Sequence, residues 1–331
     1  MTFKPKKWIG VGDFIISKYE KKYLQKVIDS NRLSYGPMSR AFESKFSQMH
    51  QTKYGIFCNS GTSALQIALA ALKEVHGWQD DDEVIVPALT FIATSNIVLY
   101  NKLKPVFVDI DPHTLCINPE EIKKKISKKT RCIIPVHFGG IPADIKRIQK
   151  LSKSNVMIIE DAAHACGSQY NGKKIGSHGD FVCFSFHPVK NLAMPTGGLI
   201  SINNHNHKKM ADDLKSKRWC GISNRKYTDY DVDKIGWNFY MNEFSAAIGL
   251  AQLEKIQKMN NKRKSIAKIY DKELNVFKKI PFTNTCVYHL YWICVRDRKF
   301  FRKKLLEKGI NKKQLGRNKF IEEVWKWKEE S

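Results

Sequence analysis

With 331 residues, the chain is long enough for one large α/β domain and a second, smaller one. Its net charge of +25 comes mostly from lysines spread along the sequence, without a basic stripe interleaved with aromatic residues, so we expect no nucleic-acid partner. Scattered cysteines without metal-ligand spacing, apolar stretches that fall short of a membrane span, and no signal peptide predict a cytoplasmic protein without a metal site or membrane anchor.

Apolar segments alternate with amphipathic ones as far as residue 202. Segments dominated by Val, Ile, Phe and Cys predict strands at 54–58, 83–87, 105–110, 131–136, 155–161, 180–186 and 197–202. The segments between them predict helices at 62–75, 91–100, 119–126 and 143–153. This alternation is typical of an α/β domain with a mainly parallel sheet covered by helices on both faces. Ligands of such sheets bind at the carboxyl ends of the strands.

A long helix is predicted over about 238–274. Its apolar face is expected to contain Phe244, Ala247, Ile248, Ala251 and Ile256. We interpret this helix as the lead into a small C-terminal domain. The predicted organisation is therefore a large domain at 1–250 and a small α/β domain at 251–331.

One lysine and one aspartate form the most informative pair in the sequence. Lys190 follows the strand predicted at 180–186, and Asp161 ends the strand predicted at 155–161. Alone, Lys190 would be a solvated surface lysine, and Asp161 a strand-end acid or a helix N-cap. Together they fit an enzyme that uses pyridoxal phosphate (PLP). The lysine amine forms a Schiff base with the aldehyde, and the carboxylate keeps the pyridine nitrogen protonated.

A phosphate-binding segment is expected where the strand at 54–58 leads into a helix. Gly61, Thr62 and Ser63 lie at this helix start, where free N–H groups and two hydroxyls can bind an anion. The alternative is an ordinary Ser/Thr helix cap. Ser185 could add a hydroxyl to the phosphate, or could be a buried strand serine bonded to backbone. The Gly-rich signatures of dinucleotide sites and P-loops are absent.

Two ring side chains are candidates for contacts with the cofactor ring. Phe91 follows the strand at 83–87 and could stack on the ring, or could be a core aromatic. His164 follows Asp161 by three residues and could lie beside the ring, whereas a lone histidine is more often structural. Neither residue indicates a function by itself.

The order of these motifs resembles the DegT/DnrJ/EryC1/StrS family of PLP-dependent sugar aminotransferases, which have aminotransferase fold type I. The resemblance runs from about Tyr19 to about Lys308. It is carried by the segments LSYGPMSRAFESKF, NSGTSALQIALAAL, DEVIVPALTFIATSNIV, KPVFVDID, IIPVHFGGIPADI, IIEDAAHACGSQYNGKKIGSHGD, FSFHPVKN, TGGLIS and GWNFYMNEFSAAIGLAQLEKI.

The resemblance implies a role for each candidate residue. Lys190 would carry the cofactor and Asp161 would face the pyridine nitrogen. The phosphate would be held at Gly61 and by Thr62, Ser63 and Ser185, while Phe91 would stack on the ring and His164 would lie beside it. Asn238 would reach the phosphate from the neighbouring subunit, because the active sites of this family are shared across a homodimer.

The resemblance also implies the reaction. Glutamate would donate an amino group through PLP to a nucleotide-linked keto-deoxy sugar, at C4 in preference to C3, for cell-surface polysaccharide or glycan biosynthesis. The sequence departs from the family at Met194-Pro195, at Tyr240 and after about residue 310, where the small domain is expected to be atypical or truncated. The alternative is therefore a PLP-binding member of the family that lacks transaminase activity and has a regulatory or degenerate role.

Overall fold

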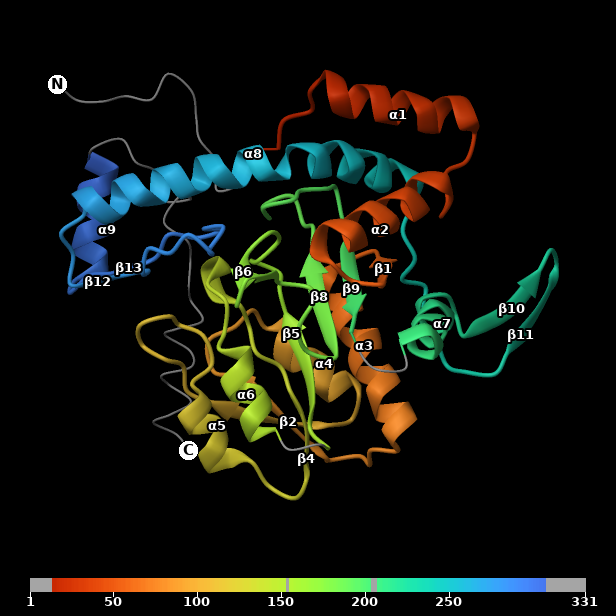
Figure 1. Cartoon of the computed structure of the whole chain (residues 1–331), viewed down its shortest axis with the longest axis horizontal. Coiled ribbons are helices and arrows are strands. Elements are labelled where there is room, and N and C mark those ends of the chain that lie inside the picture. Colours follow the sequence, from red (N-terminus) through yellow and green to blue (C-terminus); the bar gives the residue numbers. More distant parts are fainter. Residues whose placement is uncertain (1–13, 153–154, 204–206, 308–331) are drawn as a thin grey trace.

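Figure 1 shows the arrangement of residues 14–152, 155–203 and 207–307, the parts of the chain that the computed structural model describes. A seven-stranded sheet forms the centre, in the order β1-β9-β8-β5-β4-β2-β3. Its strands are β1 (Tyr54–Cys58), β2 (Glu83–Pro87), β3 (Lys104–Val108), β4 (Thr130–Ile133), β5 (Met157–Asp161), β8 (Phe181–Ser185) and β9 (Gly198–Ile202).

The sheet is mainly parallel, as predicted. Strands β3, β2, β4, β5 and β8 pair in parallel, whereas β9 runs antiparallel to both β8 and β1. Every strand except β9 therefore ends at the same edge of the sheet. The segment that joins β8 to β9 contains no helix, and a parallel neighbour would require a long crossover connection. The antiparallel direction of β9 follows from this short connection.

Helices cover both faces of the sheet, also as predicted. They are α1 (Lys18–Ser30), α2 (Pro37–His50), α3 (Gly61–His76), α4 (Ala93–Tyr100), α5 (Pro119–Lys125), α6 (Ile145–Leu151), α7 (His207–Arg218), α8 (Glu243–Glu273) and α9 (Arg298–Glu307). Successive residues of β8 show the two faces, because Phe181 packs with α3 and α7 while Val182 packs with α2 and α8. Such strands are buried on both sides, which explains their continuous apolar sequences.

The long helix α8 begins later than predicted. It starts at Glu243 and not near residue 238, because the Asn242 side chain caps it by accepting a hydrogen bond from Ser245 N–H at 2.8 Å. Phe244 is 36% exposed and does not lie on the buried face that was predicted for it. The other four apolar residues predicted for that face are buried.

The elements after α8 lie at one end of this helix (Figure 1). They are β12 (Lys278–Lys279), β13 (Ile293–Cys294) and α9. The domain boundary predicted at 250/251 falls inside α8, and the division into two domains stays a prediction. The atypical end predicted after about residue 310 lies outside the described residues.

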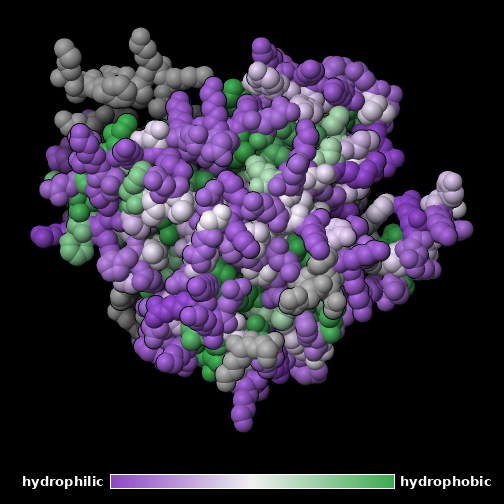
Figure 2. Space-filling model, in the orientation of Figure 1, coloured by the Kyte–Doolittle hydropathy of each residue, from purple (hydrophilic) through white to green (hydrophobic). Residues whose placement is uncertain are grey.

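Two short hairpins complete the described structure. They are formed by β6 (Gln169–Tyr170) with β7 (Lys173–Lys174), and by β10 (Ile222–Lys226) with β11 (Asp229–Val232). The β10–β11 hairpin extends away from the body (Figure 1). Figure 2 shows that this face of the molecule is mostly hydrophilic, with hydrophobic side chains in small scattered groups. Within the described ranges, no helix is both long and apolar enough to cross a bilayer.

Candidate active site

Seven of the nine predicted site residues line one cavity of about 390 Å³. It lies at the sheet edge where β1, β2, β4, β5 and β8 end, and β9 begins at the same edge. The seven residues are Gly61, Thr62, Phe91, Asp161, His164, Ser185 and Lys190. The expectation that a ligand site forms at the carboxyl ends of the strands therefore agrees with the position of this cavity.

The start of α3 forms one wall of the cavity. A Cβ atom on Gly61 would lie 2.7 Å from the Cβ of Ser185, so only glycine lets α3 approach the end of β8 this closely. Ser60 caps the helix by accepting a hydrogen bond from Ser63 N–H at 3.0 Å. The N–H groups of Gly61 and Thr62 precede the first intrahelical bonds and are available to an anion.

Two predicted phosphate ligands do not line the cavity. The Ser63 hydroxyl donates a hydrogen bond to Asn59 Oδ1 at 2.6 Å and lies 2.8 Å from Ser60 Oγ. The Asn238 side chain is exposed, and its backbone forms an isolated bridge with Trp219. The phosphate contact predicted for Ser63 stays a prediction, and so does that of Asn238, which was expected to reach the phosphate of the neighbouring subunit and not that of its own chain.

Asp161 is buried at the end of β5, and both of its carboxylate oxygens accept a hydrogen bond. Thr94 Oγ1 donates to Asp161 Oδ2 at 2.9 Å, and Ala163 N–H donates to Asp161 Oδ1 at 3.1 Å. Two donors, one on each oxygen, fix the orientation of the carboxylate. The contact from Thr94 was not foreseen, although Thr94 lies in the segment predicted to form a helix at 91–100.

Lys190 lies in a turn that follows β8. Its N–H donates to the His187 carbonyl at 2.8 Å, which closes the turn. Burial lowers the pKa of the Lys190 amine below its ordinary value, and the negative charge of Asp161 opposes part of this shift. A buried amine with a lowered pKa is suited to act as a nucleophile or a base.

His164 stacks on a second histidine that the sequence analysis missed. The rings of His164 and His289 have centroids 4.3 Å apart and an interplanar angle of 29°. Burial lowers the pKa of His164 well below its ordinary value and that of His289 to about 3. Gly139 N–H donates to His164 Nδ1 at 3.3 Å, so the neutral ring of His164 carries its proton on Nε2.

The tautomer of His289 follows from its partner, Asn191. The Asn191 Nδ2 group donates to Asn260 Oδ1 at 3.1 Å and to the Val287 carbonyl at 3.4 Å. Asn191 Oδ1 therefore faces His289 Nδ1 at 2.8 Å, and a neutral His289 must donate from Nδ1. This network connects the residue after Lys190 to α8 and to the segment between β12 and β13.

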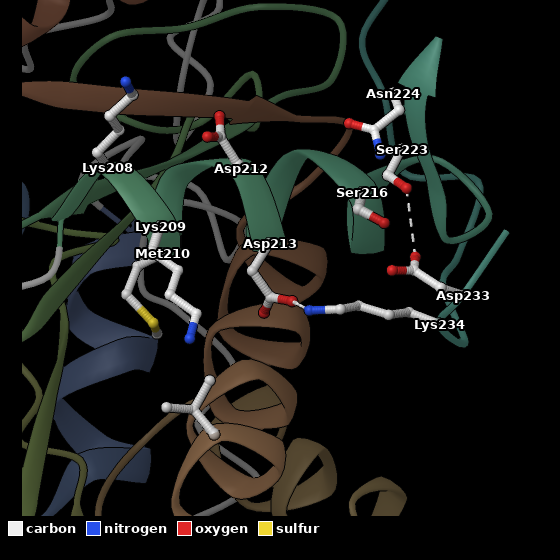
Figure 3. Close-up of a pocket in the computed structure, with 11 residues that line it drawn as sticks. Lys208, Lys209, Met210, Asp212, Asp213, Ser216, Ser223, Asn224, Asp233 and Lys234 are labelled. Carbon is white, nitrogen blue, oxygen red and sulfur yellow. Dashed lines mark hydrogen bonds and ion pairs between the residues drawn. The ribbon is translucent and has the colours of Figure 1, made fainter. Parts of the chain in front are cut away.

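A second, larger cavity of about 690 Å³ lies between α7 and the β10–β11 hairpin (Figure 3). Two of its charged groups, Asp213 and Lys234, form an ion pair, and Ser223 Oγ donates to Asp233 at 3.3 Å. None of the predicted site residues and no aromatic side chain line it. Although this cavity is larger, the smaller one holds the chemically reactive groups.

The groups in the smaller cavity fit PLP. A buried carboxylate with two donors, an amine with a lowered pKa and a helix start next to the Ser185 hydroxyl match the ring nitrogen, the aldehyde and the phosphate, respectively. Phe91, which is 72% exposed, provides an aromatic surface at the same cavity. Across the described ranges, no group of three or more His, Cys, Asp or Glu side chains could hold a metal ion.

Comparisons with known proteins agree with this chemistry. The chain is 37% identical over 289 residues to GDP-perosamine synthase of Escherichia coli O157:H7, covering 87% of this chain and 77% of the relative. The putative sugar aminotransferase Spr1654 of Streptococcus pneumoniae, in its PMP form, has a TM-score of 0.85 at 26% identity, with 91% and 82% of the two chains covered. Helicobacter pylori PseC, an aminotransferase involved in the biosynthesis of pseudoaminic acid, has a TM-score of 0.84 at 27% identity, with 95% and 87% of the two chains covered.

A model of the DegT/DnrJ/EryC1/StrS aminotransferase family matches residues 15–326. The match extends beyond Lys308, so the resemblance was predicted to end too early. Aminotransferases of this family use PLP, and the Streptococcus pneumoniae protein has been solved in PLP and PMP forms. The predictions of an aminotransferase, of PLP fold type I and of a PLP cofactor are confirmed at this level. The chain belongs to the DegT/DnrJ/EryC1/StrS aminotransferase family.

Proposed function

We propose that this protein transfers the amino group of glutamate to a nucleotide-linked keto-deoxy sugar, with PLP held in the cavity at the ends of β5 and β8. The observation that carries the proposal is that Lys190 and Asp161 line the same cavity, next to the start of α3. These two residues are separated along the chain and belong to different strand ends. The fold brings together the two groups that PLP chemistry requires.

Each residue of the cavity has a defined task in this proposal. When bound, PLP supplies an aldehyde carbon that attaches to amines and a protonated ring that withdraws electrons from that carbon. Asp161 keeps the proton on the ring nitrogen through its ionised carboxylate. The N–H groups of Gly61 and Thr62, with the hydroxyls of Thr62 and Ser185, bind the phosphate.

Lys190 is both the attachment point and the base in this proposal. Its lowered pKa increases the fraction of neutral amine. The neutral Nζ can accept a proton from the donor's α-carbon, and the protonated Nζ can then release that proton as an acid. Phe91, which lines the cavity, would stack on the ring. His164, neutral with its proton on Nε2, would lie beside the ring, with that N–H available as a donor.

The names of relatives support the sugar acceptor. One relative is a GDP-perosamine synthase, and one solved neighbour is involved in the biosynthesis of pseudoaminic acid. We propose C4 of the sugar, in preference to C3, as the aminated position and a role in cell-surface polysaccharide or glycan biosynthesis. We place the reaction in the cytoplasm, where reducing conditions suit the eight free cysteines.

We further propose a homodimer with shared active sites. Asn238 is exposed and does not line the cavity of its own chain, which is compatible with a contact to the phosphate bound by the partner. Ser63 could act through its position next to Ser60 at the helix start.

A substrate panel tests the proposal. The purified protein is incubated with PLP, glutamate and UDP-, dTDP- or GDP-linked 4-keto or 3-keto sugars, and the products are identified by mass spectrometry. An amino sugar is expected with the wild type and not with Lys190→Ala. Absence of product from every acceptor, with PLP bound, would contradict the proposed function.

Adding glutamate without a sugar acceptor distinguishes a transaminase from the alternative, a PLP-binding protein without transaminase activity. A transaminase converts its bound cofactor to the pyridoxamine form when glutamate is added, which changes the visible absorption band. A PLP-binding protein without transaminase activity keeps its band. Both functions require Lys190, so Lys190→Ala abolishes the band in either case.

A further inference from the structure

Two threonine hydroxyls form a hydrogen-bonded chain behind Asp161. Thr94, which is 0% exposed, donates from Oγ1 to Asp161 Oδ2 at 2.9 Å. Thr90, which is 7% exposed and lines the cavity, has its Oγ1 2.7 Å from Thr94 Oγ1. The chain thus runs from the cavity wall through the first turn of α4 to the end of β5.

The direction of this chain follows from donor counting. An ionised carboxylate only accepts hydrogen bonds, and a threonine hydroxyl has a single proton. The Thr94 proton is used on Asp161, so Thr94 can only accept from Thr90. Both hydroxyl dipoles therefore point toward the carboxylate, and successive hydrogen bonds of this kind strengthen one another.

The contact of Thr94 is unusual for a threonine in a helix. Ser and Thr side chains in helices commonly bond to a carbonyl of the preceding turn. The neighbouring Ser95 does so, because its hydroxyl donates to the Ile92 carbonyl at 3.0 Å. The Thr94 hydroxyl instead leaves its helix and reaches a residue 67 positions away in the sequence.

We propose that Thr94, supported by Thr90, is the positioning residue that holds the Asp161 carboxylate oriented toward the ring nitrogen of the cofactor. The inference rests on the proposed function, because it assigns the ring nitrogen as the partner of Asp161. Thr94 acts through Asp161 and touches neither cofactor nor substrate. Ala163 N–H fixes Oδ1 while Thr94 fixes Oδ2, so removal of Thr94 frees one side of the carboxylate.

Four variants separate positioning from simple stability. Thr94→Val removes the hydroxyl and keeps the shape, Thr94→Ser keeps the hydroxyl, and Thr90→Val removes the donor to Thr94. The matched control is Thr130→Val, because Thr130 is 2% exposed and its hydroxyl also accepts a hydrogen bond, from Ser127 N–H at 2.9 Å, without any contact to the cavity.

The decisive measurement uses PLP labelled with ¹⁵N at the ring nitrogen. In the wild type, Thr94→Ser and Thr130→Val, the ¹⁵N chemical shift is expected to report a protonated ring nitrogen. In Thr94→Val the signal should move toward the unprotonated value, and PLP should bind on the order of 10-fold more weakly, as for the loss of one hydrogen bond to a charged group. Thr90→Val should change both quantities in the same direction by less.

Activity provides a second readout. The rate of the half-reaction with glutamate should fall on the order of 10-fold in Thr94→Val, while the KM for glutamate stays near the wild-type value, because Asp161 acts on the ring and not on the donor. An unchanged ¹⁵N signal in Thr94→Val would overturn the proposal, even with a lower melting temperature. That combination would show that Thr94 only ties α4 to β5.

The inference can fail independently of the proposed function. If the wild type does not bind PLP, the proposed function is wrong. Crystals of the cofactor-free wild type, Thr94→Val and Thr94→Ser still test the inference, since the Asp161 carboxylate should turn away from the cavity only in Thr94→Val. The same Asp161 orientation in all three proteins would overturn the positioning role.

Discussion

His50 is expected to make the protein sensitive to acid. It ends α2 and is 0% exposed, with its ring 4.1 Å from that of Phe46 and 4.9 Å from that of Phe184. Within the described ranges, neither of its ring nitrogens has a hydrogen-bond partner. Burial, with a smaller contribution from the positive charge of Lys174, lowers the pKa of His50 to about 3.

This shift sets the size of the effect. The unfolded chain binds a proton on His50 as the pH falls below its ordinary pKa of 6.5, whereas the folded chain does not do so until about pH 3. Between these values the unfolded state binds more protons, so the free energy of unfolding falls as the pH falls, by about 1.4 kcal/mol per pH unit. Near pH 5 the loss reaches about 2 kcal/mol. For a chain of this length, that corresponds to a decrease in melting temperature of about 3 °C.

The substitution His50→Leu removes this titration without removing a hydrogen bond. The free energy of unfolding is measured by urea denaturation at about pH 7.5 and at pH 5, at a fixed protein concentration. We expect its decrease between these two pH values to be about 2 kcal/mol smaller in the variant than in the wild type. Other buried histidines remain in both proteins and cancel in the comparison. His113→Leu is the control, because His113 is exposed. Parallel stability curves for the wild type and His50→Leu would refute the reasoning.

Gly61→Ala should raise the dissociation constant of PLP about tenfold, because the new Cβ would overlap Ser185 at the end of β8. An absorbance titration with PLP measures this constant. Unchanged binding would contradict the close approach of α3 to the end of β8. His289→Phe keeps the stacking on His164 but removes the hydrogen-bond donor to Asn191 Oδ1. The free energy of unfolding should therefore fall by about 1–3 kcal/mol, and kcat should fall with it. An unaltered melting curve would exclude a role of His289 in holding Asn191. If Asn238 acts on the partner's site, mixing the inactive variants Asn238→Ala and Lys190→Ala should restore about a quarter of wild-type activity in reassociated dimers, and no recovery would argue against shared sites.

The sequence predicted the central sheet well because its strands are buried on both faces. All seven strands were located within a few residues, since continuous apolar runs bounded by polar residues have few other interpretations. The β10–β11 hairpin was missed because its strand sequences, ISNRK and DYDV, are polar and half-buried or exposed, and show no apolar alternation. The direction of β9 was also not predicted, although the lack of a helix between β8 and β9 was a usable signal.

The sequence predicted those residues of the candidate site that lie at or just after the ends of strands. Residues that follow strands in sequence, such as Asp161 and Lys190, converge because parallel strands end at one edge. Thr94 was missed, because its contact with Asp161 joins residues 67 positions apart, and Thr90 precedes the helix, so no helical spacing pointed to the pair. His289 had no signal in the sequence, because its contact with His164 depends on how the segment between β12 and β13 packs near the end of β5.

The two stacked histidines, His164 and His289, are neutral, and this affects the charge balance near Lys190. Both rings lie near Lys190, and a proton on either would place a second positive charge close to the amine. That charge would also oppose protonation of the ring nitrogen that Asp161 is proposed to hold. Burial keeps both imidazoles neutral, so neither adds a positive charge that would compete with the proposed role of Asp161. A single oriented carboxylate can thus stabilise a protonated ring while the Lys190 amine stays basic enough, and neutral often enough, to exchange protons.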